Sequence, residues 1–187
     1  MRGMKQPGIK VLLLTLILAV FCNSALFGTD RAAINVNLII DSSASLTAVK
    51  ADITTWVNGR LDQILMTGDK ITVWSAGQTS RVIYTGTINS QADREAVKRS
   101  ISALAGSGFS ADFSSALREA AGQRNQGINF TMLISASPAS LAATISGPQG
   151  NLLRFSRVEE FSGWRAIVIG LNMETRIKGA ATAFLDS

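Results

Sequence analysis

The chain has 187 residues, of which 47% are hydrophobic and 17% are charged, so it has enough apolar material for one ordinary domain and is not a disordered chain. It contains no histidine, which excludes Ser-His-Asp and Cys-His catalysis and every His-ligated metal site. The formal net charge is +5, but the basic residues of the domain are scattered rather than grouped, so the sequence predicts no nucleic-acid partner.

Three basic residues within the first ten positions precede an apolar run over residues 11–21. A charged segment followed by an apolar one is the pattern of a secretory signal. The run is short for a membrane span of roughly 20 residues, although residues 22–27 could extend it. We therefore divide the chain into residues 1–28, a signal peptide or membrane anchor, and residues 29–187, one folded domain. The domain is expected in the periplasm or another extracytoplasmic space, either free or attached to the membrane through an uncleaved N-terminal segment.

Cys22 is the only cysteine in the sequence. It could carry a lipid after cleavage, as in bacterial lipoproteins, but Phe21 directly before it is bulkier than the small residue that such processing favours. Its interpretation as an apolar residue of the export segment is therefore preferred. In either case the folded domain has no disulfide, which fits a bacterial periplasm better than a disulfide-rich animal secretion.

Beyond residue 29, short apolar segments alternate with segments of helical periodicity. Residues 33–41 begin with alternating polarity and end fully apolar, as a buried central strand does. Residues 69–74 and 81–84 are joined by a link too short for a crossover helix, which predicts an antiparallel hairpin. Helices are expected over 46–65, 91–104, 113–121, 152–161 (weakly) and 174–185, further strands over 128–135 and 166–171, and a loop with a short helical turn over 137–151.

This alternation predicts an α/β fold with a doubly wound, mainly parallel central sheet and one antiparallel edge strand, which the hairpin supplies. Binding sites in such sheets lie beyond the carboxyl ends of the strands. The first strand ends in Asp41, and Ser43 and Ser45 follow it at alternate positions. This arrangement could hold a hard cation, because Asp41 would supply charge and the two serines neutral oxygens.

The segment from Asp41 to Ser45 resembles the first element, Asp-x-Ser-x-Ser, of the metal-ion-dependent adhesion site in von Willebrand factor type A domains. Residues 108–120 are similar to that family's second site loop and the helix after it, and residues 130–135 to the strand that leads into its third site element. The resemblance covers residues 33–186 and implies a Rossmann-like α/β domain that binds other proteins.

Two family positions that would complete the metal site hold alanine. The metal-binding threonine position falls on Ala111, with Ser110 beside it, and the aspartate of the third element falls on Ala136. Asp112 could substitute as a carboxylate, but its family counterpart usually caps the following helix. The resemblance therefore implies a degenerate site that binds Mg²⁺ or Mn²⁺ weakly or not at all, and no other cofactor is expected.

Two interpretations of Asp41 stay open. In the first, Asp41, Ser43 and Ser45 bind a metal ion, with Ser110 and Asp112 as weaker candidate ligands. In the second, which is preferred, Asp41 accepts hydrogen bonds from loop amides and Ser45 caps the helix that begins at residue 46. The three tryptophans are expected in the core or at its edge rather than on a binding surface.

The sequence therefore predicts a non-enzymatic, exported interaction module, a scaffold or assembly component of a periplasmic or membrane-associated complex. The residues expected to contact its protein partner are Ser42, Ser110, Asp112 and Ser137. The alternative is a metal-dependent adhesin that uses Asp41, Ser43 and Ser45. A more remote alternative is a phosphoryl-transfer enzyme, because Asp-x-x-x-Ser after a strand resembles the haloacid dehalogenases; Ser43 stands where that family has its second aspartate, and no Gly-x-x-x-x-Gly-Lys loop occurs.

Overall fold

The computed structural model describes residues 32–122, 128–148, 150, 153 and 156–171. The expected signal or anchor segment and the expected last helix over 174–185 lie outside these residues and stay predictions. Within the described ranges, no helix combines the length and the hydropathy that crossing a membrane requires.

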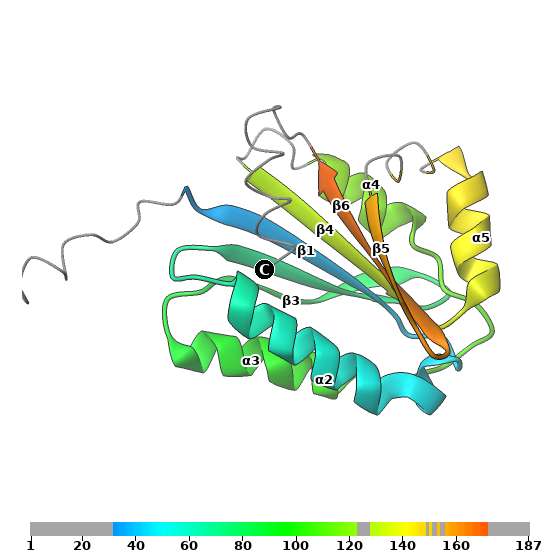
Figure 1. Ribbon diagram of the computed structural model, residues 1–187, viewed down its shortest axis with the longest axis horizontal. Coiled ribbons are helices and arrows are strands. Elements are labelled where there is room, and N and C mark those ends of the chain that lie inside the picture. The colour runs from blue at the N-terminus through cyan, green and yellow to red at the C-terminus, as the bar shows by residue number, and fades with distance from the viewer. Residues whose placement is uncertain (1–31, 123–127, 149, 151–152, 154–155, 172–187) are drawn as a thin grey trace, which may run out of the picture. The chain divides into compact units, whose positions relative to one another are not determined.

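The described residues form a mixed α/β fold in which helices cover both faces of one six-stranded sheet (Figure 1). The strands are β1 (Ile34–Asp41), β2 (Lys70–Ala76), β3 (Ser80–Thr87), β4 (Ile128–Ser135), β5 (Ser156–Phe161) and β6 (Trp164–Leu171). The helices are α2 (Leu46–Ile64), α3 (Gln91–Ser102), α4 (Ser114–Gly122) and α5 (Pro138–Ser146). The strand order is β3-β2-β1-β4-β6-β5, with β1 parallel to both of its neighbours, so Asp41 ends an internal strand as the sequence predicts.

The sheet has two antiparallel strands where the sequence analysis expected one. The predicted edge strand β3 runs against β2, and β6 runs against β4. The weak helix expected over 152–161 is wrong in its second half, because residues 156–161 form β5. β5 pairs with β6 across a two-residue turn in which Gly163 has a φ of 84°, a conformation that glycine adopts readily. Because of this hairpin, β5 rather than β6 takes the second edge of the sheet.

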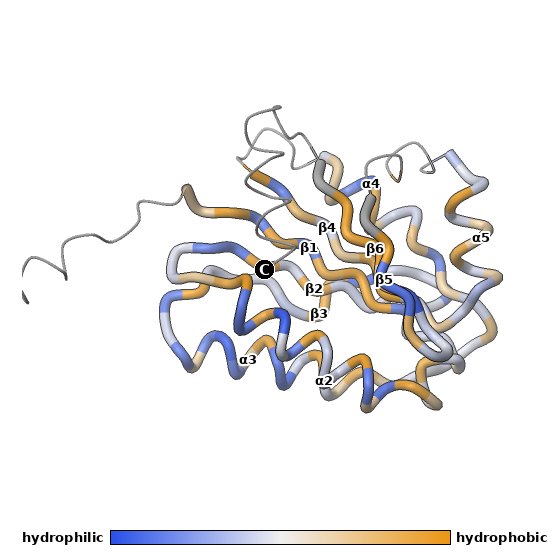
Figure 2. The backbone as a smooth tube through the Cα atoms, in the orientation of Figure 1, coloured by the Kyte–Doolittle hydropathy of each residue, from blue (hydrophilic) through white to orange (hydrophobic). Residues whose placement is uncertain are grey.

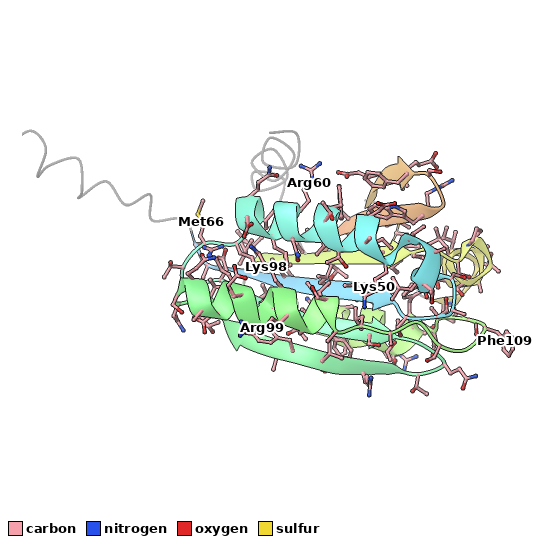
Figure 3. The ribbon with its side chains drawn as sticks, turned by 90° about the horizontal axis from the view of Figure 1, so that it is seen from below. Lys50, Arg60, Met66, Lys98, Arg99 and Phe109 are labelled. Carbon is pink, nitrogen blue, oxygen red and sulfur yellow. The ribbon has the colours of Figure 1, made fainter. Side chains whose placement is uncertain are left out.

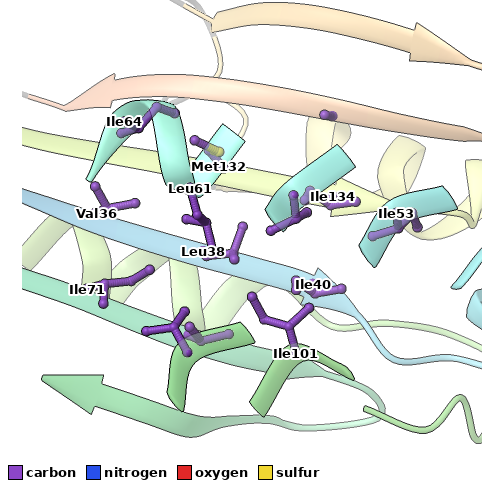
Figure 4. Close-up of a cluster of buried hydrophobic side chains, with 14 of the residues drawn as sticks. Val36, Leu38, Ile40, Ile53, Leu61, Ile64, Ile71, Ile101, Met132 and Ile134 are labelled. Atoms are coloured by element: carbon purple, nitrogen blue, oxygen red, sulfur yellow. The ribbon is translucent and has the colours of Figure 1, made fainter. Parts of the chain in front are cut away.

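Two hydrophobic clusters lie on opposite faces of the sheet. Residues Val36, Leu38 and Ile40 of β1 point to the face that α2 and α3 cover, together with Ile53 of α2 and Ile101 of α3 (Figure 4). The remaining face packs on α4, and its residues include Ile39, Trp74, Phe113, Leu117 and Leu133. Figure 2 shows the central strands as mostly hydrophobic, whereas α3 is hydrophilic over much of its length. This two-sided burial explains why β1 ends as a continuous apolar run.

The tryptophans belong to the interior, as expected. Trp74 and Trp164 are each 3% exposed, and the half-buried Trp56 of α2 packs against the β5–β6 hairpin. The ring centroids of Trp56 and Trp164 are 5.5 Å apart at an interplanar angle of 70°, and Phe161 stacks on Trp164 at 3.9 Å. The edge-to-face and stacked contacts fix the tip of the hairpin against α2.

Asp69 holds the opposite end of the sheet together. It is 1% exposed, and its Oδ1 accepts a hydrogen bond from the Ile34 N–H at 3.0 Å while its Oδ2 accepts one from the Met66 N–H at 2.8 Å. The carboxylate therefore ties the first residue of β1 to the connection between α2 and β2.

We expect Asp69→Asn to lower the free energy of unfolding by about 2 kcal/mol, because one acceptor oxygen becomes an NH₂ group that faces a buried N–H donor. Urea unfolding of the full chain measures this change. Asp52→Asn, at an exposed position on α2, is the control and should change stability little. Equal stability of the two variants would contradict the role given to Asp69.

Candidate functional site

Asp41 is a buried carboxylate at the carboxyl end of β1, with 0% of its surface exposed. Its Oδ1 accepts a hydrogen bond from the Ser43 N–H at 2.8 Å. Its Oδ2 accepts one from the Ser135 hydroxyl at 2.9 Å and another from the Ala136 N–H at 3.2 Å. Both oxygens are thus engaged by protein donors, the arrangement that the preferred interpretation of the sequence describes.

A chain of hydrogen bonds through three serines extends from Asp41 across the ends of the strands. Ser135 Oγ accepts from the Ser137 N–H at 3.0 Å, and Ser137 Oγ accepts from the Ser140 hydroxyl at 2.9 Å. Ser140 Oγ in turn accepts from the Ala111 N–H at 2.9 Å. Ser137 is also the N-cap of α5, where it accepts from the Ser140 N–H and precedes Pro138 at the first helical turn. The network therefore joins β1, β4, the start of α5 and the loop before α4.

That loop, residues 105–112, is fixed on its other side as well. The Ser107 N–H donates to Ser42 O at 2.8 Å, and the Asp112 N–H donates to Gly77 O at 2.8 Å. Gly106 permits the approach, because a Cβ there would lie 2.6 Å from Ser43 O. The loop is thus held between the β1–α2 connection and the β2–β3 hairpin.

The three residues of the Asp-x-Ser-x-Ser motif have different environments. Ser43 Oγ is buried and has no hydrogen-bond partner among the residues that the structure describes. Ser45 occupies the N-cap position of α2, but its side chain makes no capping hydrogen bond, so that part of the sequence prediction is wrong. The reason is its backbone, which is already helical at φ −58° and ψ −27°, whereas a capping side chain needs an extended residue.

Ser110 and Asp112 lie on the exposed side of the loop. Asp112 Oδ1 accepts from the Ser114 N–H at 2.8 Å and so caps α4, the function that the sequence analysis considered for it beside metal binding. Neither residue has a hydrogen bond to Asp41 in the part of the chain that the structure describes. Of the four expected partner-contacting residues, Ser110 and Asp112 are exposed, whereas Ser42 and Ser137 each line a pocket.

The donor set around Asp41 does not fit a tightly bound divalent ion. Among the described residues there is no group of three or more His, Cys, Asp or Glu side chains that could hold a metal. The buried Ser43 hydroxyl would suit an ion, but a single carboxylate with both oxygens engaged supplies little charge. That Asp41, Ser43 and Ser45 hold Mg²⁺ or Mn²⁺ only weakly or not at all stays a prediction.

Two pockets flank the Asp41 network. The helix pocket, of about 540 Å³, lies between α5 and the β5–β6 turn and has an apolar wall that includes Leu141, Ile145 and Trp164. The hairpin pocket, of about 440 Å³, lies between the β2–β3 hairpin and residues 105–108. Phe109 lies on the loop 105–112 and is 98% exposed, at the end of the domain opposite Met66 (Figure 3).

Sequence reasoning missed Ser135, Ser140 and Phe109. Ser135 could have been found from strand order, because β4 is the parallel neighbour of β1 and Ile134 pairs with Ile40, one residue before each end. Phe109 also had a signal, since a large aromatic residue between Gly108 and Ser110 has no helical or strand periodicity to bury it. Ser140 had no such signal, because its role depends on where the loop before α4 lies.

Comparison with solved structures finds a von Willebrand factor type A protein from Catenulispora acidiphila, with a TM-score of 0.43 and 19% identity over 51% of this chain and 23% of that one. It also finds the pilus adhesin SpaC from Lactobacillus rhamnosus GG, in an open conformation with a TM-score of 0.42 and 14% identity over 52% of this chain and 13% of that one. A second form of SpaC has a TM-score of 0.45 and 14% identity over 79% of this chain and 19% of that one. The chain thus spans less than a quarter of the length of each protein.

No protein-family model matches the sequence, and no curated protein matches it. The mixed α/β fold is consistent with the von Willebrand factor A resemblance of the sequence.

Proposed function

We propose that this chain is an exported interaction module of the von Willebrand factor A type, which binds another protein through its strand-end face. This face comprises Ser42, the loop 105–112, and the start of α5 with Ser137. The observation that carries the proposal is Phe109, which is 98% exposed on a loop that hydrogen bonds fix on both sides. An exposed aromatic side chain on a rigid loop loses little conformational entropy on binding, which is why such residues serve as interface anchors.

Binding through this face is proposed to need no metal. In metal-bridged adhesion the ion would complete its coordination with a group from the partner, so it has to be held firmly by the domain. Here the oxygens of Asp41 accept hydrogen bonds from Ser43, Ser135 and Ala136 instead. The burial of Asp41 argues against the phosphoryl-transfer alternative. Its carboxylate is 0% exposed and is therefore not placed to attack a substrate.

The N-terminal segment is proposed to direct the domain out of the cytoplasm. Its support is the sequence alone, three basic residues followed by the apolar run over residues 11–21. We expect cell fractionation to place the protein in the periplasm or on the membrane, with N-terminal sequencing showing whether the segment is cleaved. Recovery of the full-length chain as a freely soluble cytosolic protein would contradict export.

The binding face can be tested by isolating the native complex from membranes with the full chain as bait. We expect Phe109→Ala to reduce recovery of the partner by about tenfold, the loss of a typical aromatic anchor. Met66→Ala is the matched control, because Met66 is also an exposed hydrophobic residue, 43% exposed, but lies at the opposite end of the domain (Figure 3).

Undiminished recovery with Phe109→Ala, or a loss with Met66→Ala instead, would move the interface away from the strand-end face. Repeating the isolation with a chelator separates the proposal from the adhesin alternative. The proposal requires that the partner stays bound.

A further inference from the structure

The hairpin pocket has an unusual lining for its position on the strand-end face. Polar groups predominate in it, among them the hydroxyls of Ser42, Ser75 and Ser107 and the side chain of Arg81. The floor is ordered, since Ser42 and Ser75 are each 5% exposed and the Ser75 hydroxyl donates to Ser42 Oγ at 2.8 Å. With that bond made, the Ser42 hydroxyl retains its own proton for a ligand.

Arg81 is placed to give this pocket its charge. It lies on β3 directly opposite Ser75, so both side chains belong to the same face of the hairpin. The residue is exposed, and its guanidinium makes no hydrogen bond or ion pair within the described part of the chain. The five N–H donors of this side chain are therefore free for a ligand.

The described lining of the pocket includes no acidic residue that would neutralise the charge of Arg81. The nearest acidic residue along the neighbouring loop, Asp112, uses Oδ1 to cap α4 and is not part of the lining. A free guanidinium beside hydroxyl donors, with no competing carboxylate, favours a planar anion that can accept two parallel hydrogen bonds.

The pocket adjoins a partly apolar recess, which distinguishes it from a simple anion site. An adjoining pocket of about 360 Å³ shares Ser75, Arg81, Ala105 and Ser107 with it and adds Ile83, Ala103 and Leu104, together with one further hydroxyl, that of Ser100. The recess lies at the end of α3, since Ala103 and Leu104, which follow its last residue Ser102, line it. Arg81 thus stands between a polar and a partly apolar compartment, which suits an acidic group with an apolar neighbour in a peptide.

We propose that the hairpin pocket binds a carboxylate of the partner protein, with the guanidinium of Arg81 as its main ligand and the hydroxyls of Ser42 and Ser107 as further donors. This inference rests on the proposed function, because it names what the strand-end face recognises. The carboxylate belongs either to an Asp or Glu side chain or to the C-terminus of the partner, since both present the same planar anion to Arg81.

The test uses the isotope-labelled full chain in detergent micelles, with NMR signals of the Ser42, Ser75 and Ser107 amides as the readout. Three probes are titrated: acetyl-Leu-Glu-amide, which carries a side-chain carboxylate; acetyl-Leu-Leu as the free acid, which carries a terminal one; and acetyl-Leu-Gln-amide, which is neutral. We expect at least one charged probe to shift these signals and the neutral probe to bind about tenfold more weakly or not at all. The charged probe that binds more tightly identifies the source of the carboxylate.

Arg81→Gln removes the charge but keeps an N–H donor, and we expect it to weaken binding of the charged probe by about tenfold or more. Arg81→Lys restores the charge without the planar fork and should recover only part of the affinity. Arg118→Gln is the matched control, an exposed arginine on α4 that lies outside the pocket. It should bind like the unaltered chain.

The inference would be overturned if the neutral probe bound as tightly as the charged ones, or if Arg81→Gln bound like Arg118→Gln. Shifts caused by inorganic phosphate, with no response to either carboxylate probe, would also overturn it. Isolation of the native complex with the Arg81→Gln bait separates the two levels of the proposal. If this bait recovers the partner fully while Phe109→Ala does not, the carboxylate inference fails and the interaction face stands.

Discussion

Asp41→Ala is expected to lower the free energy of unfolding by about 3 to 5 kcal/mol, because it leaves three donors without their acceptor in the interior. These donors are the N–H groups of Ser43 and Ala136 and the hydroxyl of Ser135. The network beyond them should loosen too, since Ser135 links Asp41 to the N-cap of α5. Urea unfolding measures the loss, and hydrogen exchange at the Ala111 amide reports whether the loop before α4 is released.

Ser45→Ala is the matched control for this variant. Ser45 lies in the same motif, yet its side chain makes no capping hydrogen bond, so its replacement should change stability by only a few tenths of a kcal/mol. If Asp41→Ala were no more destabilising than Ser45→Ala, the network would not hold the strand ends together. The strand-end face could then not be treated as a rigid binding surface.

Trp164→Ala should be comparably severe, at about 3 to 5 kcal/mol, because it removes a large side chain that is 3% exposed. The truncation empties the space beside Trp56 and Phe161, whose rings lie 5.5 and 3.9 Å from that of Trp164. It thereby removes one of the two ring contacts between the β5–β6 hairpin and α2, and leaves only the edge-to-face contact of Phe161 with Trp56 at 5.5 Å. The helix pocket, which this hairpin walls, should lose its shape at the same time.

Thermal and urea unfolding measure the effect of Trp164→Ala, and Phe109→Ala serves as the control of similar chemistry. Phe109 is 98% exposed, so its truncation should leave stability within about 0.5 kcal/mol of the unaltered chain. Similar losses in both variants would show that Phe109 is buried in solution, which would undermine its proposed function as an anchor.

The centre of the sheet could be predicted from the sequence because its signals are local. The fully apolar end of β1 indicates two-sided burial, and the short link between β2 and β3 permits only a hairpin. The β5–β6 hairpin was missed, because residues 152–161 have no clear alternation and because Ser162-Gly163 is a hairpin turn only if β5 is recognised as a strand.

The candidate site was predictable only in part, for a similar reason. Asp41 follows from its position at the end of a central strand, and the capping function of Asp112 follows from the helix after it. The rest of the network joins segments that are far apart in the sequence. Asp41 accepts a hydrogen bond from Ser135, 94 residues away, and Ser140 accepts one from Ala111, 29 residues away. Arg81 is a surface residue by its pattern, and only the position of loop 105–108 makes it part of a pocket.

The central claim, that the strand-end face works without a metal ion, is tested most directly by magnesium and manganese titrations of the melting temperature. A ligand stabilises a protein by RT ln(1 + [L]/Kd), so an ion present near its Kd adds about 0.4 kcal/mol, whereas an intact site saturated a hundredfold adds about 2.7 kcal/mol. We predict the smaller effect, unchanged in Ser43→Ala, whose hydroxyl has no partner in the described domain. A stabilisation of about 2.7 kcal/mol that Ser43→Ala abolishes would contradict the account and make the protein a metal-dependent adhesin.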